Sequence, residues 1–398
     1  MNADSKSATL GASIRDMDPE HSIAYVREAP VDTLPPPIST RGLYGWLRLN
    51  FFATPLDALL TILTVLLLLW VVPPFIQFVL IDAVWTGADR EACIATAARP
   101  EVGACWPFVR DRFSYFIYGS YPIPERWRVD IFFAMLAFGI VWLLKLNAPR
   151  RDLGAIYFFF IMPIVSFILL TGTQTLDLRP VDTTLWGGVL VTIVVATVGI
   201  VVSLPVGIML ALGRRSRMPA VRLLSVVFIE FVRGVPLVTV LFMASVMLPL
   251  FVPEQYSPDK LLRALIGIAM FASAYMAEVV RAGLQAIPKG QYEGAAAVGL
   301  SYSQMMRFII LPQALKITIP NIVNTYIGLF KDTTLVFIVG IFDLLKTIEV
   351  SRIDPKWAAP TTSTTGYVFA AVFYFVFCYM MSRYAKNMEA RLARSDHR

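Results

Sequence analysis

Residues 184–212 read TLWGGVLVTIVVATVGIVVSLPVGIMLAL and contain no charged side chain. A helix needs about 20 predominantly apolar residues to cross the hydrocarbon core of a bilayer, so this run is long enough to span a membrane. Such runs recur along the chain of 398 residues, which is 57% hydrophobic and only 16% charged. We therefore predict an all-α membrane protein with about eight spanning helices, at residues 56–81, 131–146, 153–171, 184–212, 223–252, 261–283, 314–340 and 366–384.

The segments between these runs differ in composition. Residues 1–40 are polar, contain Pro35-Pro36-Pro37 and lack the apolar stretch of a cleavable signal peptide. We expect a disordered cytoplasmic tail there. The predicted parts are this tail (1–54), three spans with a periplasmic loop at 82–130 (55–182), a core of five spans with a cytoplasmic loop at 284–312 (183–384), and a basic tail (385–398).

Basic residues indicate which face of the membrane is cytoplasmic. They cluster at 145–151, 214–222 and 383–398, and all three segments fall on one face if there are eight spans. Cytoplasmic loops have an excess of Lys and Arg, so this face, with both termini and the loop 284–312, is predicted to be cytoplasmic. The loop 82–130 contains six arginines and seven acidic residues, and it fits this topology least well.

The loop 284–312 contains the stretch Glu293-Gly-Ala-Ala-Ala-Val-Gly299, which is followed by Ile309-Ile-Leu311-Pro312. Pro288 should end the preceding helix, because proline lacks a donor and restricts the residue before it. A short helix is expected at 291–298, with the glutamate in its first turn, where the helix dipole favours a carboxylate. The sequence therefore predicts a small, weakly charged helix between two apolar spans.

Capping residues follow this short helix. Gly299 suits a left-handed cap, and Ser301 and Gln304 have the spacing of a capping box for a second helix. The second helix should run to a break at Leu311-Pro312. We expect two short helices at an angle that present a smooth surface, although an ordinary connector between two spans is the alternative. The small residues of this surface are Gly294, Ala295 and Ala296.

The full pattern, E-x-A-x3-G-x9-I-x-L-P, resembles the cytoplasmic EAA loop through which ABC importer permeases dock onto their ATPase. Residues 183–384 resemble the five-helix, type I core of the polar amino acid permeases among these importers. The additional N-terminal spans, the cysteine-bearing loop and Arg126-Trp-Arg-Val-Asp130 look like the M-type permease of general L-amino acid importers. The phrases that resemble the core are Val232-Arg-Gly-Val-Pro236, Ala274-Tyr-Met-Ala-Glu-Val-Val-Arg281, Ile287-Pro-Lys-Gly-Gln-Tyr-Glu293, Leu311-Pro-Gln-Ala-Leu315 and Leu329-Phe-Lys-Asp-Thr-Thr334.

The resemblance implies a permease subunit that translocates L-amino acids, with broad or polar specificity, across the bacterial inner membrane. Its implied partners are an ABC ATPase dimer that binds ATP and Mg, a second permease subunit (a paralogous Q-type chain or a second copy), a periplasmic amino acid-binding protein, and membrane lipid. At Gly294 the chain departs from the family, where alanine is usual, and this weakens the helix by about 1 kcal/mol. The residues implied in ATPase coupling are Glu293, Gly294, Ala295, Gly299, Leu311 and Pro312.

Other functional classes have less support in the sequence. No lysine follows a glycine, so a Walker A phosphate loop is impossible and any ATPase activity is expected on a separate chain. The two histidines, His21 and His397, lie in the tails, so neither a metal site nor an enzyme is predicted, and no cofactor is expected in this chain. No basic stripe with interleaved aromatic residues suggests nucleic acid. A self-sufficient secondary transporter or channel is the alternative function.

Several polar residues lie inside the predicted spans. An amino acid presents a carboxylate and an ammonium group, and Lys331, Asp332 and Thr333 offer a cation, an anion and a hydroxyl within one span. Asn324 is seven residues before Lys331 and shares its helix face. Charged groups in a span are costly and face a cavity or pair with each other, so a substrate path and an internal ion pair are both open. Glu278 is a further candidate for the path, or it pairs with the arginine three residues on.

Three cysteines complete the set of candidate sites. Cys378 lies in the last apolar run and is expected to be a packing residue. Cys93 and Cys105 are twelve residues apart in the predicted periplasmic loop, where an oxidising compartment permits a disulfide. Two free thiols are the alternative, because sequence does not fix the distance between their Cα atoms.

Overall fold

The computed structural model describes residues 42–97, 99–145 and 148–396. The chain forms two compact units, Met1–Pro74 and Phe75–Arg398, which are described separately. In the described residues, seven helices are long and apolar enough to cross a membrane, or eight if one sharply bent pair counts as a span. The predicted all-α membrane class is therefore confirmed. The predicted disorder of residues 1–41 lies outside the described residues.

The first unit contains two helices. Helix α2 (Gly42–Phe51) contains Trp46 and precedes α3 (Pro55–Ile76), whose last two residues belong to the second unit. Thr54 caps α3: its backbone amide and hydroxyl donate to Asp57, whose own amide donates back to the Thr54 hydroxyl. The prediction of one disordered tail over residues 1–54 is thus wrong for α2, where the apolar content is sufficient for a helix.

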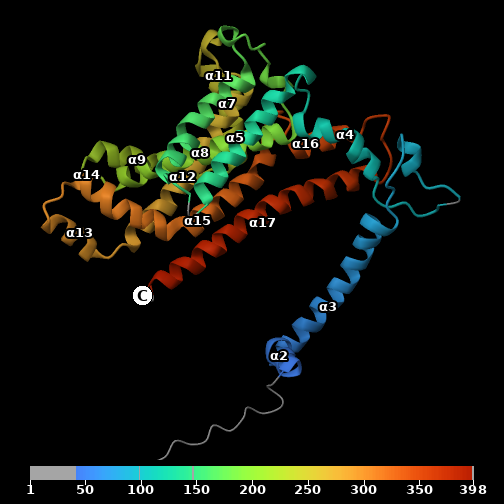
Figure 1. The fold of residues 1–398 in the computed structure, drawn as a ribbon, viewed down its shortest axis with the longest axis horizontal. Coiled ribbons are helices and arrows are strands. Elements are labelled where there is room, and N and C mark those ends of the chain that lie inside the picture. The colour runs from blue at the N-terminus through green and yellow to red at the C-terminus, as the bar shows by residue number, and fades with distance from the viewer. Residues whose placement is uncertain (1–41, 98, 146–147, 397–398) are drawn as a thin grey trace, which may run out of the picture. The chain divides into compact units, whose positions relative to one another are not determined.

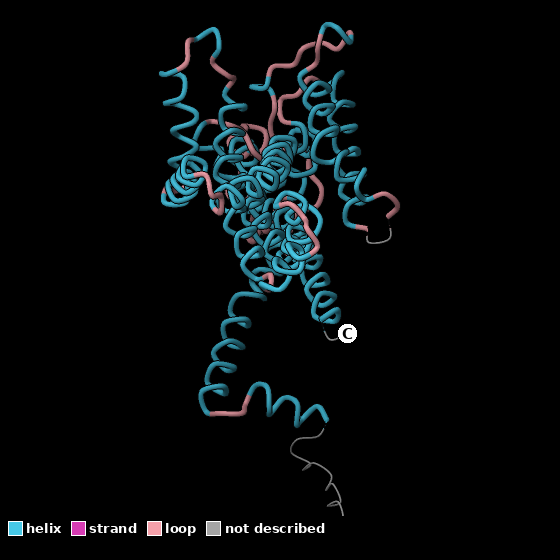
Figure 2. Tube along the Cα trace, turned by 90° about the vertical axis from the view of Figure 1, so that its left-hand side faces the viewer, coloured by secondary structure: helices cyan, strands magenta, loops and turns pink. Residues whose placement is uncertain are grey.

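The second unit consists of helices joined by loops (Figure 2). Short helices α13 and α14 lie at one end of its bundle, and α4 and α16 lie at the other (Figure 1). Its helical segments are η3 (Gln77–Ile81), η4 (Arg90–Cys93), α4 (Trp106–Tyr118), η5 (Ile123–Glu125), α5 (Arg126–Leu144), α6 (Arg151–Ile156), η6 (Tyr157–Ile161), α7 (Met162–Thr171), η7 (Gln174–Leu176), η8 (Thr183–Leu185), α8 (Gly188–Arg214), α9 (Pro219–Gly234), α10 (Leu237–Phe242), η9 (Met243–Met247), α11 (Leu248–Phe251), η10 (Glu254–Tyr256), α12 (Lys260–Ala286), α13 (Lys289–Ala297), α14 (Tyr302–Met305), η11 (Met306–Ile310), α15 (Leu311–Asp332), η12 (Thr333–Val339), α16 (Leu344–Ser351) and α17 (Thr362–Asp396).

Helices α8 and α12 form the centre of the second unit, and α15 packs between α12 and α17. Small residues allow these helices to approach closely, as is usual between membrane helices. A Cβ atom at Gly283 of α12 would lie 2.6 Å from Cγ2 of Thr318 and 2.7 Å from the carbonyl oxygen of Ala314, both on α15. Any larger residue at Gly283 would therefore force α12 and α15 apart.

The predicted span at 223–252 is not a single straight helix. Helix α9 ends at Gly234, and the segment Leu237–Phe251 leaves it at 108°. Val235 and Pro236 are extended between them, because proline fixes its own backbone and disfavours helix in the residue before it. This bend lies where the run Arg233-Gly-Val-Pro236 interrupts the apolar pattern.

The predicted break at Leu311-Pro312 is wrong. Residues Tyr302–Val339 form one helical run, in which the π-helical turn η11 leads directly into α15. In this turn the amide of Leu311 donates to the carbonyl of Met306, five residues back. Pro312 has no amide hydrogen to contribute, and the wider turn accommodates its ring without ending the helix. The short helix after the capping box is thus the first part of a membrane span.

The C-terminal segment also differs from its prediction. Helix α17 continues to Asp396, so residues 385–396 are helical instead of a separate tail. The short helix α16, which was not predicted, precedes α17 and is capped by buried Asp343. The Asp343 carboxylate accepts hydrogen bonds from the amides of Leu345 and Lys346, at 3.0 and 3.1 Å. Local capping therefore stabilises α16 within a segment too short to show a clear apolar period.

Candidate functional site

The loop 284–312 is built from local signals. Pro288 is the N-cap of α13, so this helix begins at Lys289, two residues earlier than predicted. Glu293 is consequently the fifth residue of the helix and lies outside its first turn, and the predicted dipole interaction is wrong. Gly299 has a φ of +78°, a left-handed conformation that glycine adopts without strain. Ser301 and Gln304 form the predicted capping box.

The outer surface of α13 is smooth and open. Glu293, Gly294 and Gly299 are exposed, and a Cβ atom added to either glycine would meet no atom within 4 Å. Val298, between them, exposes 73% of its surface. Ala295 does not belong to this surface, because only 3% of it is exposed and it faces the interior. The expectation that Gly294, Ala295 and Ala296 share one exposed face is therefore wrong for Ala295.

A small apolar cluster holds the loop against the helix bundle. Leu284 and Ile287, before α13, and Met306 and Ile310, after it, are buried together with Ala211, Met276, Val280, Ala314 and Ile322. Leu311 packs at the edge of this cluster, whereas Pro312 is exposed. Because α8, α12 and α15 all contribute to the cluster, the loop is attached to three spans at once.

Arg215 and Tyr292 connect the loop to the end of α8. The Arg215 guanidinium donates to the hydroxyl of Tyr292 over 3.1 Å and lies over its ring, 5.5 Å from the centroid. The Tyr292 hydroxyl donates in turn to the carbonyl of Leu284 over 2.9 Å. Beside these groups is an open hollow of about 400 Å³, lined also by Gln285, Ile287, Lys289 and Glu293. Sequence reasoning used Arg215 only for topology and missed this contact.

Glu278 lies in a cluster of charges from three helices. Its carboxylate, 14% exposed, is 2.9 Å from Arg214 of α8, 3.4 Å from Arg233 of α9 and 2.7 Å from Nε of Arg281 of α12. Glu230 pairs with Arg214 at 2.8 Å and makes no ion pair with the arginine three residues on, among the described residues. Glu278 thus pairs along its own helix as considered from the sequence, but two of its three partners come from other helices.

Polar residues on α15 form an exposed face. Asn321, Asn324, Gly328 and Lys331 recur at helical spacing and are exposed or half-buried. We call these four residues the α15 polar face. The ammonium of Lys331 makes no ion pair or hydrogen bond to the described residues, so the alternative of an internal ion pair is not what the structure contains. A free ammonium on an exposed face is available to a ligand.

The residues that follow Lys331 turn inward. Asp332 is half-buried and Thr333 is fully buried. The hydroxyl of Thr333 donates to the carbonyl of Phe330 over 2.8 Å, and that of Thr334 to the carbonyl of Lys331 over 2.9 Å. Both threonine hydroxyls are therefore hydrogen-bonded within their own helix, which is a structural role.

At the opposite end of the bundle, Cys93 and Cys105 form a disulfide, with their Cα atoms 5.7 Å apart. Both cysteines are buried, and the amide of Cys105 donates to the hydroxyl of Thr365 over 2.8 Å. Helix α4 follows directly, and its Asp111 accepts hydrogen bonds from the Lys356 ammonium and the Trp357 indole, at 2.8 and 2.7 Å. The disulfide-bonded segment is thus attached to the segment that precedes α17.

Comparison with known proteins gives matches over nearly the whole chain. A family model described as "Binding-protein-dependent transport system inner membrane component" matches residues 203–394, which include the loop 284–312 and the α15 polar face. The chain is 47% identical over 346 residues to the inner membrane amino-acid ABC transporter permease protein YhdY of Escherichia coli (strain K12), covering 87% of this chain and 92% of YhdY. It is 39% identical over 437 residues to the glutamate/glutamine/aspartate/asparagine transport system permease protein BztC of Rhodobacter capsulatus, covering 94% of this chain and 99% of BztC.

Shorter relatives and solved structures match about half of this chain. A probable glutamine ABC transporter permease protein, GlnP of Bacillus subtilis, is 33% identical over 207 residues, covering 52% of this chain. A crystal structure of an amino acid ABC transporter with histidines covers 51% of this chain and 92% of that chain, at 27% identity and a TM-score of 0.45. The long, high-identity matches to YhdY and BztC show that the chain belongs to the family of binding-protein-dependent transport system inner membrane components.

Proposed function

We propose that this chain is the permease subunit of an ABC importer that carries L-amino acids across the inner membrane. The loop 284–312 supports this proposal most directly. It exposes small residues on α13, is anchored by apolar side chains to three spans, and is connected to α8 through Arg215 and Tyr292. Such a surface is small enough to fit a groove on a partner and is attached firmly enough to transmit its movement. The names of the relatives YhdY and BztC support amino acids as the substrate class.

The partner at this loop is, on this proposal, an ABC ATPase dimer that binds ATP and Mg. Glu293, Gly294 and Gly299 would contact it, because they are exposed together on α13 and its C-terminal cap. Leu311 and Pro312 would act through the start of α15, and Ala295 would hold α13 against the bundle. On this proposal the loop and both termini would lie on the cytoplasmic face, which the basic segments at 145–151 and 214–222 support.

The substrate would pass along the α15 polar face. Lys331 would attract the carboxylate of an amino acid. Asn324, seven residues earlier on the same helix face, offers an amide donor and acceptor. Asp332 would be the acceptor for the ammonium group. Since this face is open in a single chain, a second permease subunit would close the path, and a periplasmic amino acid-binding protein would deliver the substrate to it. Glu278 would act at the cytoplasmic side, by holding three helix ends together.

The test is a charge reversal on the exposed face of α13. Glu293→Arg is compared with Glu389→Arg, which reverses an equally exposed glutamate on α17 outside the loop. Each variant is expressed in a strain that lacks the chain, and membrane insertion, co-purified ATPase and uptake of radiolabelled glutamate, glutamine and alanine are measured. We expect Glu293→Arg to insert normally and to lose both ATPase association and uptake, whereas Glu389→Arg retains both.

The same experiment separates the two functions considered from the sequence. A self-sufficient secondary transporter needs no ATPase, so its uptake would persist in Glu293→Arg and would disappear when the proton gradient is dissipated. Undiminished uptake without a bound ATPase would overturn the importer proposal. As a second perturbation of the same surface, Gly299→Asp should uncouple ATP hydrolysis from uptake, because a side chain at φ +78° is strained and occupies the open face.

A further inference from the structure

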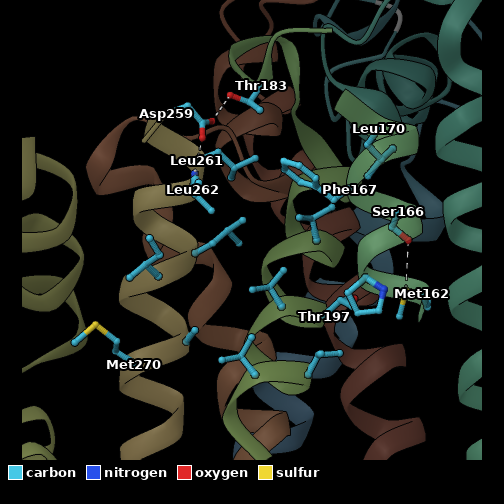
Figure 3. A pocket seen from close by; sticks show the side chains of 18 of the residues that line it. Met162, Ser166, Phe167, Leu170, Thr183, Thr197, Asp259, Leu261, Leu262 and Met270 are labelled. Carbon is cyan, nitrogen blue, oxygen red and sulfur yellow. Dashed lines mark hydrogen bonds between the residues drawn. The ribbon is translucent and has the colours of Figure 1, made fainter. Parts of the chain in front are cut away.

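A long apolar groove lies on the membrane-embedded side of the central helices. Its floor is α8 and its walls are α7 and α12, as Figure 3 shows, with Met270 on one wall and Phe167 on the other. The groove has a volume of about 640 Å³, within the range of about 300–1,000 Å³ that small-molecule sites occupy. All three helices belong to candidate membrane spans, so we expect hydrocarbon around the groove, and membrane lipid is the available ligand.

The interior of the groove suits a hydrocarbon chain. Its lining residues on α8 run from Val194 to Val206, twelve residues that rise about 18 Å along the helix, close to the length of an extended fatty acyl chain. The hydroxyls of Ser166 and Ser273, which also line it, are satisfied by Met162 and by the carbonyl of Ala269. The described interior therefore offers apolar contact along its length and little that would hold a polar ligand.

One end of the groove is polar. Thr183 donates a hydrogen bond to Asp259 over 2.5 Å at this mouth, and Figure 3 shows the pair above the apolar side chains. The exposed Asp259 carboxylate makes no ion pair among the described residues, and exposed Asp182, next to Thr183, makes none either. The residues that line this mouth are thus acidic, and the neighbouring Lys260 ammonium donates to the carbonyl of Gly340 instead of pairing with Asp259, which favours a headgroup with an amine over an anionic one.

A buried donor lies near the same end. Trp186 lines the groove and is only 5% exposed, yet its indole N–H has no hydrogen-bond partner among the described residues. A buried donor without a partner is costly, and tryptophan at a membrane interface usually satisfies its N–H with a polar group there. The ester and phosphate oxygens of a phospholipid would supply such an acceptor, and a purely apolar ligand would not.

We propose that this groove binds one phosphatidylethanolamine molecule, with an acyl chain between α7 and α12 and its amine at Asp259. The acyl chain fills the length of α8 that the groove exposes, the ammonium pairs with Asp259, and an ester or phosphate oxygen accepts from Trp186. The proposal is independent of the transported substrate, because none of the α15 polar face or of the loop 284–312 lines the groove.

The test uses the full chain in lipid nanodiscs with phosphatidylethanolamine that has a photoactivatable diazirine on its acyl chain. After illumination, labelled peptides are identified by mass spectrometry, and unlabelled phosphatidylethanolamine or phosphatidylglycerol is added as competitor. We expect labelling concentrated on the groove-lining residues of α7, α8 and α12, and stronger competition by phosphatidylethanolamine. Equal labelling of all membrane-exposed helices, with equal competition by both lipids, would overturn the proposal.

Three variants and a matched control sharpen the result. Val198→Trp places bulk on the floor of the groove and should remove labelling there, whereas Val372→Trp, at an exposed site on α17, should not.

Asp259→Asn should lower the preference for phosphatidylethanolamine about two- to fivefold, the effect of losing one exposed ion pair. If Val198→Trp fails to fold, the competition on the wild-type chain still decides. Cross-linking of Val202→Cys to another protein chain, instead of protection by lipid, would assign the groove to a subunit contact and overturn the proposal.

Discussion

Arg215 donates a hydrogen bond to the hydroxyl of Tyr292 over 3.1 Å, and a weaker one to the carbonyl of Leu284 over 3.4 Å. Three elements meet at this point, because Arg215 is the C-cap of α8, Leu284 lies near the end of α12, and Tyr292 belongs to α13. The short helix α13 is therefore fastened by polar contacts on one side and by the apolar cluster on the other.

Tyr292→Phe should weaken the attachment of α13 to α8 and α12 while keeping the aromatic ring. The change removes the bonds to Arg215 and Leu284, each worth about 1 kcal/mol, and leaves the cation–π contact. We expect a lower ratio of transported substrate to hydrolysed ATP in proteoliposomes that contain the assembled importer. Tyr302→Phe is the control, since this exposed tyrosine in the same loop makes no side-chain hydrogen bond to the described residues. An unchanged ratio in Tyr292→Phe would show that the contact does not transmit movement.

Glu278→Gln should destabilise the chain, because it leaves Arg214, Arg233 and Arg281 without their shared carboxylate. The loss of charged hydrogen bonds at a largely buried site costs about 1.5–3 kcal/mol. The thermal unfolding midpoint in detergent measures it. Glu349→Gln, which removes a more exposed pair with Lys346, should change stability by less than about 1 kcal/mol. Equal midpoints for the two variants would contradict the clustering argument.

Lys331→Met tests the α15 polar face. Lys331 has no ion pair among the described residues, so its loss should leave folding and ATPase association intact. Uptake should fall about tenfold or more, since a charged hydrogen bond to a substrate carboxylate is worth about 1.5–3 kcal/mol. The control is Lys316→Met, an exposed lysine on the same helix outside this face, for which uptake should stay near the wild-type rate. A similar rate in both variants would remove Lys331 from the path.

Local signals made parts of the site predictable. Helix ends depend on residues within one helical turn, and such signals are visible in the sequence. Helices begin or end where the sequence indicated at Pro288, Gly299 and the Ser301–Gln304 pair. The apolar runs likewise indicated the approximate positions of the spans, because length and apolar composition decide whether a helix can cross the membrane.

Long-range contacts were not predictable in the same way. Glu278 takes two of its partners from other helices, and no spacing along the chain encodes such a meeting. Ala295 faces inward because the packing of α13 on the bundle sets its rotation. Pro312 predicts a helix end from the local sequence, but a π-helical turn before it removes the need for its missing amide donor. The formation of this π-helical turn depends on the packing of the whole span.

The stability of the chain should depend on pH through Asp343. Burial raises the pKa of its carboxyl to about 6, from 3.8, although hydrogen bonds from Lys346, Leu345 and Tyr374 oppose this. Between these values the folded chain binds a proton that the unfolded chain does not, so the free energy of unfolding falls as pH rises. We expect a decrease of about 2 kcal/mol between pH 4 and pH 7, measured by unfolding in detergent. Above that range the contribution is constant.

Asp343→Asn removes this titrating group and should flatten the decrease. Asp182→Asn is the control, because hydrogen bonds from Thr184 lower the pKa of Asp182 and its contribution has the opposite sign. The slope between pH 5 and pH 7 should therefore survive in Asp182→Asn. A slope that also survives in Asp343→Asn would assign it to another group.

The disulfide should stabilise the segment before α4. Replacing Cys93 and Cys105 with alanine opens a loop of twelve residues, for which the entropic contribution is about 3 kcal/mol. We expect a lower unfolding midpoint that reductant does not lower further, whereas Cys378→Ser should leave the response to reductant intact. Limited proteolysis would locate the effect, with new cleavage between residues 82 and 105. A double variant as stable and protease-resistant as the wild type would contradict this role.

The unbroken helical run Tyr302–Val339 joins the end of the loop 284–312 to the α15 polar face, so the two can move together as one lever. From Thr318 to Lys331 the helix rises about 20 Å, so a tilt of about 5° about Thr318 displaces Lys331 by about 2 Å. The close contact of Gly283 with Ala314 and Thr318 lies between the two ends and is placed to serve as the fulcrum. A push on the arm beside α13 would then move the ammonium of Lys331 by about 2 Å.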